Sequence, residues 1–112
     1  MSVAKPKWLE TIFPWEQKQL VVNGRRMAYI DEGDPGARPV LLLSGNPTWG
    51  VLYRDFIPVL TRGGYRAIAP DWVGAGYSDH PRIDAALTFA HHIADLVSLL
   101  DQLDLRDFVI VG

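Results

Sequence analysis

Residues 39–43 read Pro39-Val40-Leu41-Leu42-Leu43, an uninterrupted apolar run of the kind that forms a strand buried on both faces of a sheet. Two later runs, at residues 65–70 and 108–112, have the same character. Apolar residues at helical spacing separate the three runs, at residues 51–60 and 87–103. Strands that alternate with helices in this way predict an α/β fold with a mostly parallel sheet.

The two predicted helices differ in how regular their sequence patterns are. The first contains Pro58, which we expect to kink or shorten it, and Gly63-Gly64 end it. The second has one apolar stripe, formed by Ile93, Leu96, Val97, Leu100 and Leu103, with Asp95, Asp101 and Gln102 off the stripe. Such an amphipathic helix is predicted to pack its stripe against the sheet. The remaining acidic positions are interpreted as solvated surface charge, namely Asp31, Glu32, Asp95, Asp101 and Asp104.

An antiparallel hairpin is predicted before the parallel strands. Two short β-prone runs, at residues 19–22 and 26–31, flank Asn23-Gly24, a dipeptide typical of tight hairpin turns. Residues 1–18 lack clean periodicity and are predicted to form an extended N-terminal arm whose aromatic residues dock on the core. Residues 19–112 are then predicted to form the N-terminal portion of one α/β domain.

Composition excludes several classes of function. The chain has 112 residues and a net charge of −2, which excludes nucleic-acid binding driven by bulk charge. It contains no cysteine, which excludes disulfides, thiolate nucleophiles and cysteine-based metal sites. No apolar run approaches the ~18 residues of a membrane span, and the N-terminus does not resemble a signal peptide. We predict a cytoplasmic protein with neither a nucleic-acid nor a membrane partner. No metal site is predicted, since His91 and His92 diverge by about 100° on a helix.

The turn after the first buried strand is the first candidate site. It reads Ser44-Gly45-Asn46-Pro47-Thr48-Trp49 and precedes a predicted helix. Glycine permits close backbone approach, a helix N-terminus presents N–H groups, and the Asn46 amide adds two donors, so the turn suits an anion. The alternative is that Asn46 or Thr48 caps the helix. Local sequence leaves both interpretations open.

A second turn follows the strand at residues 65–70. It reads Asp71-Trp72-Val73-Gly74-Ala75-Gly76-Tyr77-Ser78-Asp79. The spacing lacks the third glycine of a dinucleotide fingerprint and the Gly-Lys-Ser/Thr of a phosphate-binding loop. We therefore interpret it as a glycine-permitted tight turn in which Asp71 satisfies loop amides.

Taken together, these motifs resemble the N-terminal part of an α/β-hydrolase fold enzyme, and more narrowly the haloalkane dehalogenase-like group. Residues 43–49 are similar to the His-Gly-Asn-Pro-Thr oxyanion turn of that group, with Ser44 in place of the usual His. Residues 68–79 resemble its Ala-Pro-Asp-x-x-Gly-x-Gly-x-Ser-Asp segment, and residues 100–112 resemble the helix and strand before the nucleophile elbow. The resemblance runs from about Leu20 to Gly112.

The resemblance implies a covalent hydrolysis. An Asp displaces halide from an alkyl carbon, and a His-activated water then hydrolyses the ester. Asn46 would stabilise the halide and the oxyanion, and Asn46 and Trp49 would contact the substrate, a halogenated alkane or a related ester or epoxide. No cofactor is implied. The nucleophile, base and acid would all lie beyond Gly112.

The chain is expected to be truncated at the strand before the nucleophile elbow, and this 112-residue fragment to be inactive alone. Three related activities stay open, namely epoxide hydrolase, β-lactone-cleaving enzyme and serine esterase. A non-catalytic binding domain on the same scaffold is the alternative from another class.

Overall fold

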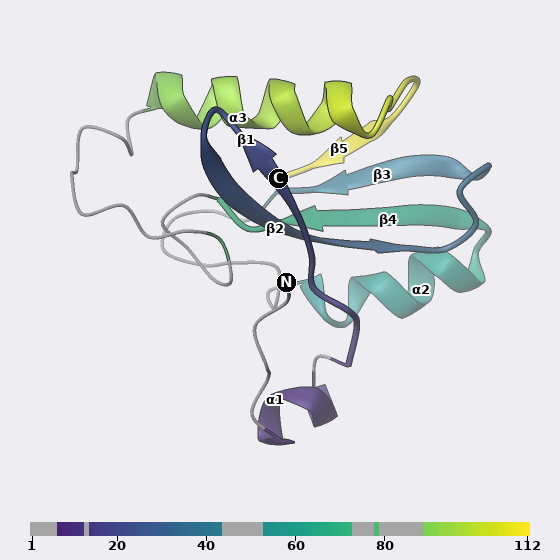
Figure 1. Ribbon diagram of the computed structural model, residues 1–112. Coiled ribbons are helices and arrows are strands. Elements are labelled where there is room, and N and C mark those ends of the chain that lie inside the picture. Colours follow the sequence, from purple (N-terminus) through teal and green to yellow (C-terminus); the bar gives the residue numbers. More distant parts are fainter. Residues whose placement is uncertain (1–6, 13, 44–52, 73–77, 79–88) are drawn as a thin grey trace.

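The computed structural model describes residues 7–12, 14–43, 53–72, 78 and 89–112. The elements are α1 (Lys7–Ile12), β1 (Lys18–Val22), β2 (Arg25–Glu32), β3 (Arg38–Leu42), α2 (Phe56–Arg62), β4 (Tyr65–Pro70), α3 (Phe89–Gln102) and β5 (Val109–Val111). The strands form one five-stranded sheet in the order β1-β2-β4-β3-β5 (Figure 1). None of the helices in these ranges is long and apolar enough to cross a bilayer.

The sheet is antiparallel on one side and parallel on the other. Strand β2 pairs antiparallel with both β1 and β4, whereas β3 pairs parallel with β4 and β5. Helix α2 covers one face of the sheet and α3 covers the other (Figure 1). The predicted α/β fold and its N-terminal hairpin are confirmed, and the sheet is mixed because β2 pairs antiparallel with β4 as well as with β1.

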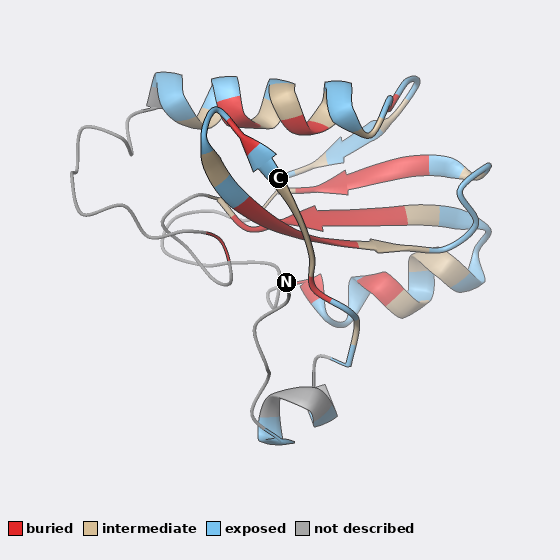
Figure 2. Cartoon of the chain, viewed as in Figure 1, coloured by how far each residue is buried: buried red, intermediate tan, exposed pale blue. Residues whose placement is uncertain are grey.

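The core lies on both faces of the inner strands, because alternate residues of a strand point to opposite faces. On the α2 face, Val40 and Leu42 of β3 cluster with Ile57 of α2. On the α3 face, Leu41 and Ile68 pack with side chains of α3 and of the loop that follows it. Figure 2 shows this burial concentrated in the middle of the sheet.

The hairpin turn has the predicted chemistry. Asn23 has φ 49° and Gly24 has φ 82°, so both occupy the left-handed region that a two-residue hairpin turn of this type requires. Glycine reaches this region without steric cost, and asparagine tolerates it better than most residues. The Asn-Gly pair therefore fixes the register in which Val22 faces Arg25.

Part of the N-terminal arm is helical, which corrects the prediction of an extended segment. Residues 7–12 form α1, and at six residues this helix is too short to show an apolar period. The predicted docking is confirmed for Trp15, which packs against the α2-side core. It is wrong for Trp8, which is 66% exposed, and Phe13 lies outside the described residues.

Helix α2 begins at Phe56, five residues later than the predicted start. Asp55 occupies the position before the helix, so Pro58 lies in the first turn. A proline there removes an N–H that has no partner within the helix, which is why it breaks no ladder hydrogen bond. Gly63 ends the helix as predicted, with its N–H donating to the Val59 carbonyl at 3.0 Å.

Helix α3 packs three residues of the predicted stripe against the core, namely Leu96, Leu100 and Leu103, but the rest of its buried face differs from the prediction. Ile93 and Val97 are exposed, whereas Leu99 is fully buried. Asp95, predicted to be solvated, is also fully buried. The buried face is shifted because α3 covers the hairpin as well as the parallel strands, and the hairpin supplies polar partners for Asp95.

Strand β5 forms where it was predicted but is not buried. Val109 and Ile110 are exposed, and within the described part of the chain β5 pairs with β3 alone. The apolar run predicts the strand correctly, while its burial depends on neighbours that the run does not specify.

Candidate functional site

The candidate site is the edge of the sheet at which the parallel strands end. Because β3, β4 and β5 run in the same direction, their carboxyl ends meet at one edge, which is where ligands bind in open α/β sheets. Both predicted turns leave from this edge, after Leu43 and Pro70. Asn46 and Trp49 lie outside the described residues, so their roles stay predictions. The structure does describe the residues that flank each turn.

The base of the first turn is closed by a tyrosine hydroxyl. Tyr53 donates to the Leu43 carbonyl at 2.5 Å, across the interval of residues 44–52. The Leu43 N–H donates to the Val111 carbonyl at 2.8 Å, which ties the same residue to β5. Tyr53 is buried in the α2-side core and meets Phe56 edge to face, with ring centroids 5.5 Å apart. Both backbone polar groups of Leu43 are thus satisfied at the end of β3.

The base of the second turn is closed by a serine hydroxyl. Ser78 is buried, and its Oγ donates to the Asp71 carbonyl at 2.5 Å. The same Oγ accepts the Ala28 N–H at 2.8 Å, and the Asp71 N–H donates to the Ala28 carbonyl at 2.8 Å. Ser78 therefore ties the end of β4 to the middle of β2. Asp71 itself is buried, so its carboxylate belongs to the interior of the edge.

Aromatic packing joins this edge to α3. The rings of Trp72 and His92 lie 5.3 Å apart at an interplanar angle of 57°. Trp72 also packs against the cluster that contains Met27 and Leu99. The chain that leaves β4 is therefore held against α3 before it enters residues 73–77, which lie outside the described range.

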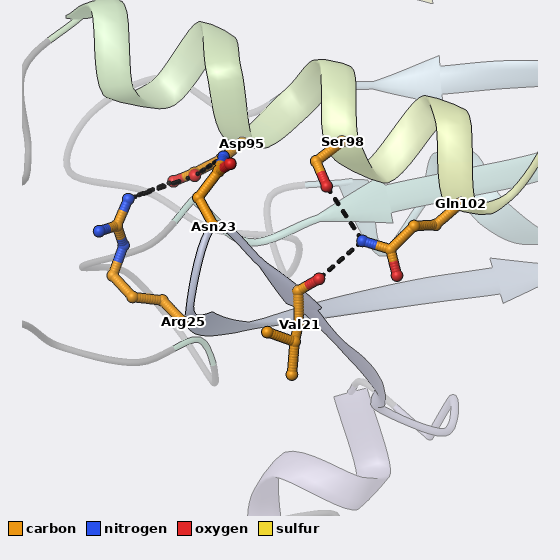
Figure 3. Close-up of polar contacts among 6 residues, drawn as sticks. All are labelled: Val21, Asn23, Arg25, Asp95, Ser98 and Gln102. Carbon is orange, nitrogen blue, oxygen red and sulfur yellow. Dashed lines mark hydrogen bonds and ion pairs between the residues drawn. The ribbon is translucent and has the colours of Figure 1, made fainter.

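A polar cluster holds the hairpin to α3 (Figure 3). The Asn23 side-chain amide donates to Asp95 Oδ1 at 3.0 Å, and an Arg25 guanidinium nitrogen lies 3.3 Å from the same oxygen. Gln102 Nε2 donates to the Val21 carbonyl at 2.6 Å and to Ser98 Oγ at 3.0 Å. A buried carboxylate is tolerated when it is paired and hydrogen-bonded, which explains how Asp95 can be interior.

A second ion pair lies towards the amino end of β4. Arg66 Nε donates to Asp31 Oδ1 at 2.7 Å and its Nη2 to Oδ2 at 2.5 Å, a bidentate arrangement. The prediction that Asp31 is solvated is therefore wrong, since both side chains are largely buried. The hydrogen bond with Asp31 raises the pKa of Arg66, and burial followed by the Asp31 charge raises the pKa of Tyr29. This pair is structural, because it lies at the opposite end of β4 from the candidate edge.

Metal chemistry has no candidate within the described ranges, where no group of three His, Asp or Glu side chains is arranged as ligands. The edge instead offers two buried hydroxyl groups, of Tyr53 and Ser78, each of which donates to the carbonyl of the residue at which a predicted turn leaves the sheet. Sequence reasoning predicted the two turns, most of whose residues lie outside the described ranges, and missed the hydroxyl groups that bond to the residues flanking them. The available signals were Tyr53, in the stretch after the first turn, and Ser78, in the second motif.

Comparison with known proteins identifies the family of this chain. The sequence pattern of the alpha/beta hydrolase fold matches residues 38–112. The chain belongs to the alpha/beta hydrolase fold family. The matched residues include β3, α2, β4, α3 and β5, and thus the whole candidate edge.

Two kinds of enzyme are similar to this chain, namely haloalkane dehalogenases and epoxide hydrolases. A haloalkane dehalogenase of Psychrobacter cryohalolentis is 48% identical over 85 residues, which is 76% of this chain and 28% of that protein. The structure of haloalkane dehalogenase DpaA from Paraglaciecola agarilytica NO2 superposes with a TM-score of 0.84 at 38% identity, covering 98% of this chain and 40% of that one. Epoxide hydrolase A from Mycobacterium thermoresistibile gives a TM-score of 0.79 at 31% identity, covering 88% and 31%. The chain spans less than half the length of each of these relatives.

Proposed function

We propose that this chain supplies the N-terminal part of a haloalkane dehalogenase, an enzyme that hydrolyses a carbon–halogen bond in a small organic molecule. The observation that carries the proposal is the 48% identity to a haloalkane dehalogenase over 76% of the chain. The structural comparison favours the same class, with a TM-score of 0.84 against 0.79 for the epoxide hydrolase. The small-molecule partner and the cytoplasmic location stay predictions.

The proposed chemistry needs an anion site at the end of β3. A carboxylate oxygen attacks the halogen-bearing carbon, the carbon–halogen bond breaks, and its electron pair leaves with the halide. Activated water then attacks the carbonyl of the resulting ester, which releases the alcohol and regenerates the carboxylate. Asn46 is proposed to donate to the halide as its charge develops, with the Asn46 turn also serving the oxyanion, and Trp49 is proposed to contact the substrate. The nucleophile is proposed to lie after Gly112.

The architecture of the edge supports an anion site of this kind. Leu43, the residue before the Asn46 turn, is held by the Tyr53 hydroxyl and by the Val111 carbonyl. Donors that are held in place before the reaction stabilise developing charge without reorganisation. A turn with a fixed base is therefore suited to the task.

Epoxide hydrolysis is the second candidate, favoured by the 31% identity to an epoxide hydrolase over 88% of the chain. Both reactions open a polarised carbon–heteroatom bond and develop negative charge on the departing atom. They differ in whether that atom leaves as a halide or stays attached as an alkoxide. Assays of the intact enzyme with a terminal bromoalkane and with a terminal epoxide distinguish them. Halide release is expected, and turnover of the epoxide alone would replace the dehalogenase assignment.

Asn46 has a sharper test, in two variants of the intact enzyme. Asn46→Asp retains a helix-capping oxygen but removes both amide donors, whereas Asn46→Ala removes both functions. If Asn46 donates to the halide, both variants lose about 10²- to 10³-fold in turnover. If it only caps a helix, Asn46→Ala lowers the free energy of unfolding by about 1 kcal/mol and Asn46→Asp is nearly neutral. Halide release and the urea midpoint, measured on each variant, decide between these outcomes.

A further inference from the structure

We infer that Tyr53 is a positioning residue for the anion-binding turn, acting through its hydroxyl on the Leu43 carbonyl. The inference rests on the proposed function insofar as residues 44–49 are taken to bind the developing anion. Tyr53 itself contacts neither substrate nor halide in this assignment. Its role is to fix the direction in which the chain leaves β3.

The hydrogen bond joins the two ends of the interval that contains the turn. Leu43 is the first residue after β3, and Tyr53 stands three residues before α2 begins. The bond between them is short, at 2.5 Å, and Tyr53 is only 7% exposed. Nine residues, 44–52, therefore span two points that are held together by one hydroxyl group.

The carbonyl of Leu43 belongs to the peptide unit through which the chain enters the turn. A peptide unit is planar, so a hydrogen bond to its carbonyl oxygen restrains the orientation of the whole unit. The Leu43 N–H is already held by the Val111 carbonyl at 2.8 Å. With both groups bound, the remaining freedom at the end of β3 is small, and the turn starts from a defined direction.

The tyrosine ring and its hydroxyl have separable roles. The ring packs in the core with Val40, Leu42 and Ile57 and meets Phe56 edge to face. A phenylalanine at position 53 retains this packing and removes only the donor. A purely structural role would then cost stability without changing turnover per folded molecule. A positioning role predicts a loss in turnover, since small displacements of catalytic groups can cost up to about 10²-fold in rate.

The experiment compares Tyr53→Phe with Tyr65→Phe in the intact enzyme that contains this chain. Tyr65 is exposed at the start of β4, far from the turn, so its variant controls for loss of a tyrosine hydroxyl. The substrate is whichever of the bromoalkane or the epoxide the wild-type enzyme hydrolyses. We expect Tyr53→Phe to lower kcat about 10- to 100-fold with little change in KM, at a temperature where both variants are fully folded. Tyr65→Phe is expected to match the wild type.

Amide hydrogen exchange gives a second readout that does not depend on turnover. Faster exchange at residues 44–49 in Tyr53→Phe, with α2 and β4 unchanged, supports the positioning role. Unchanged kcat together with unchanged exchange at these residues overturns it, whatever the effect on the melting temperature. An enzyme that hydrolyses epoxide alone contradicts the dehalogenase assignment, yet Tyr53 is then judged by the same two measurements on that substrate.

Discussion

Strands β3 and β5 are neighbours whose paired residues are all apolar, yet β3 is buried and β5 is largely exposed. They pair in register, so that Val40, Leu41 and Leu42 lie beside Val109, Ile110 and Val111 respectively. Leu41 is fully buried, whereas Ile110 is 56% exposed. Both point towards the face that carries α3, because they occupy matched positions of parallel strands.

The difference in burial arises from the strands and helices next to each strand and not from the character of its side chains. Strand β3 has a strand on each side, while β5 has β3 on one side within the described part of the chain. Leu41 also lies under α3 and the loop after it, in a cluster with Leu105 against which Leu100 packs. An apolar run therefore predicts the ability to be buried, and the position in the sheet determines whether it is.

The largest effect is expected when Leu41 and Ile110 are truncated in turn. Leu41→Ala removes buried side-chain volume and should lower the free energy of unfolding by about 2–5 kcal/mol. Ile110→Ala at an exposed position should cost about 0.5 kcal/mol or less. Urea unfolding of both variants of the 112-residue chain measures the contrast. Equal losses would show that β5 is covered in solution and would remove the distinction between the two strands.

The same contrast extends to charged pairs. Asp31 and Arg66 are largely buried on β2 and β4, whereas Asp104 and Arg106 form a 3.1 Å pair whose side chains are about 80% exposed. Asp31→Asn should cost about 2 kcal/mol, because it weakens hydrogen bonds to a charged, partly buried partner. Asp104→Asn should have no measurable effect, as is usual for exposed pairs. The two unfolding midpoints, compared at low and high salt, test the difference, and a strong salt effect on the Asp31 pair would argue that it is solvated.

The smallest expected effect concerns Tyr29, a buried residue of β2. Burial and the Asp31 charge raise the pKa of Tyr29 above its ordinary value of 10.0. As the pH rises past 10, the unfolded chain loses the phenol proton while the folded chain keeps it. Stability contributed by Tyr29 is thus complete below pH 10 and is lost as the pH rises through the higher folded pKa. Tyr29→Phe should show a shallower alkaline loss of stability than the wild type, and identical slopes would contradict this assignment.

Much of the fold could be predicted from the sequence. The Asn23-Gly24 turn and the apolar runs of β3 and β4 gave correct elements, because the signals are local. Asp95 could not be predicted as buried, since its partners Asn23 and Arg25 lie about 70 residues away in sequence. The same applies to Ser78, whose hydroxyl accepts the N–H of Ala28 in β2, 50 residues away in sequence. At the candidate site, the sequence predicted the turns, and Asn46 and Trp49 remain predictions.

The strand order has a consequence for the time course of folding. Val22 faces Arg25 across the hairpin at a separation of 3 residues (25 − 22), whereas Val40 faces Val109 across 69 residues (109 − 40). Hairpins form in about 1–10 μs, and distant pairings are slower because a long loop must close first. The hairpin is thus expected to exist before α3 docks, and Asn23 is already held in its turn when Asp95 arrives. Asn23, which shapes a local turn, thereby provides a hydrogen-bond partner for a helix that lies about 70 residues later in the sequence.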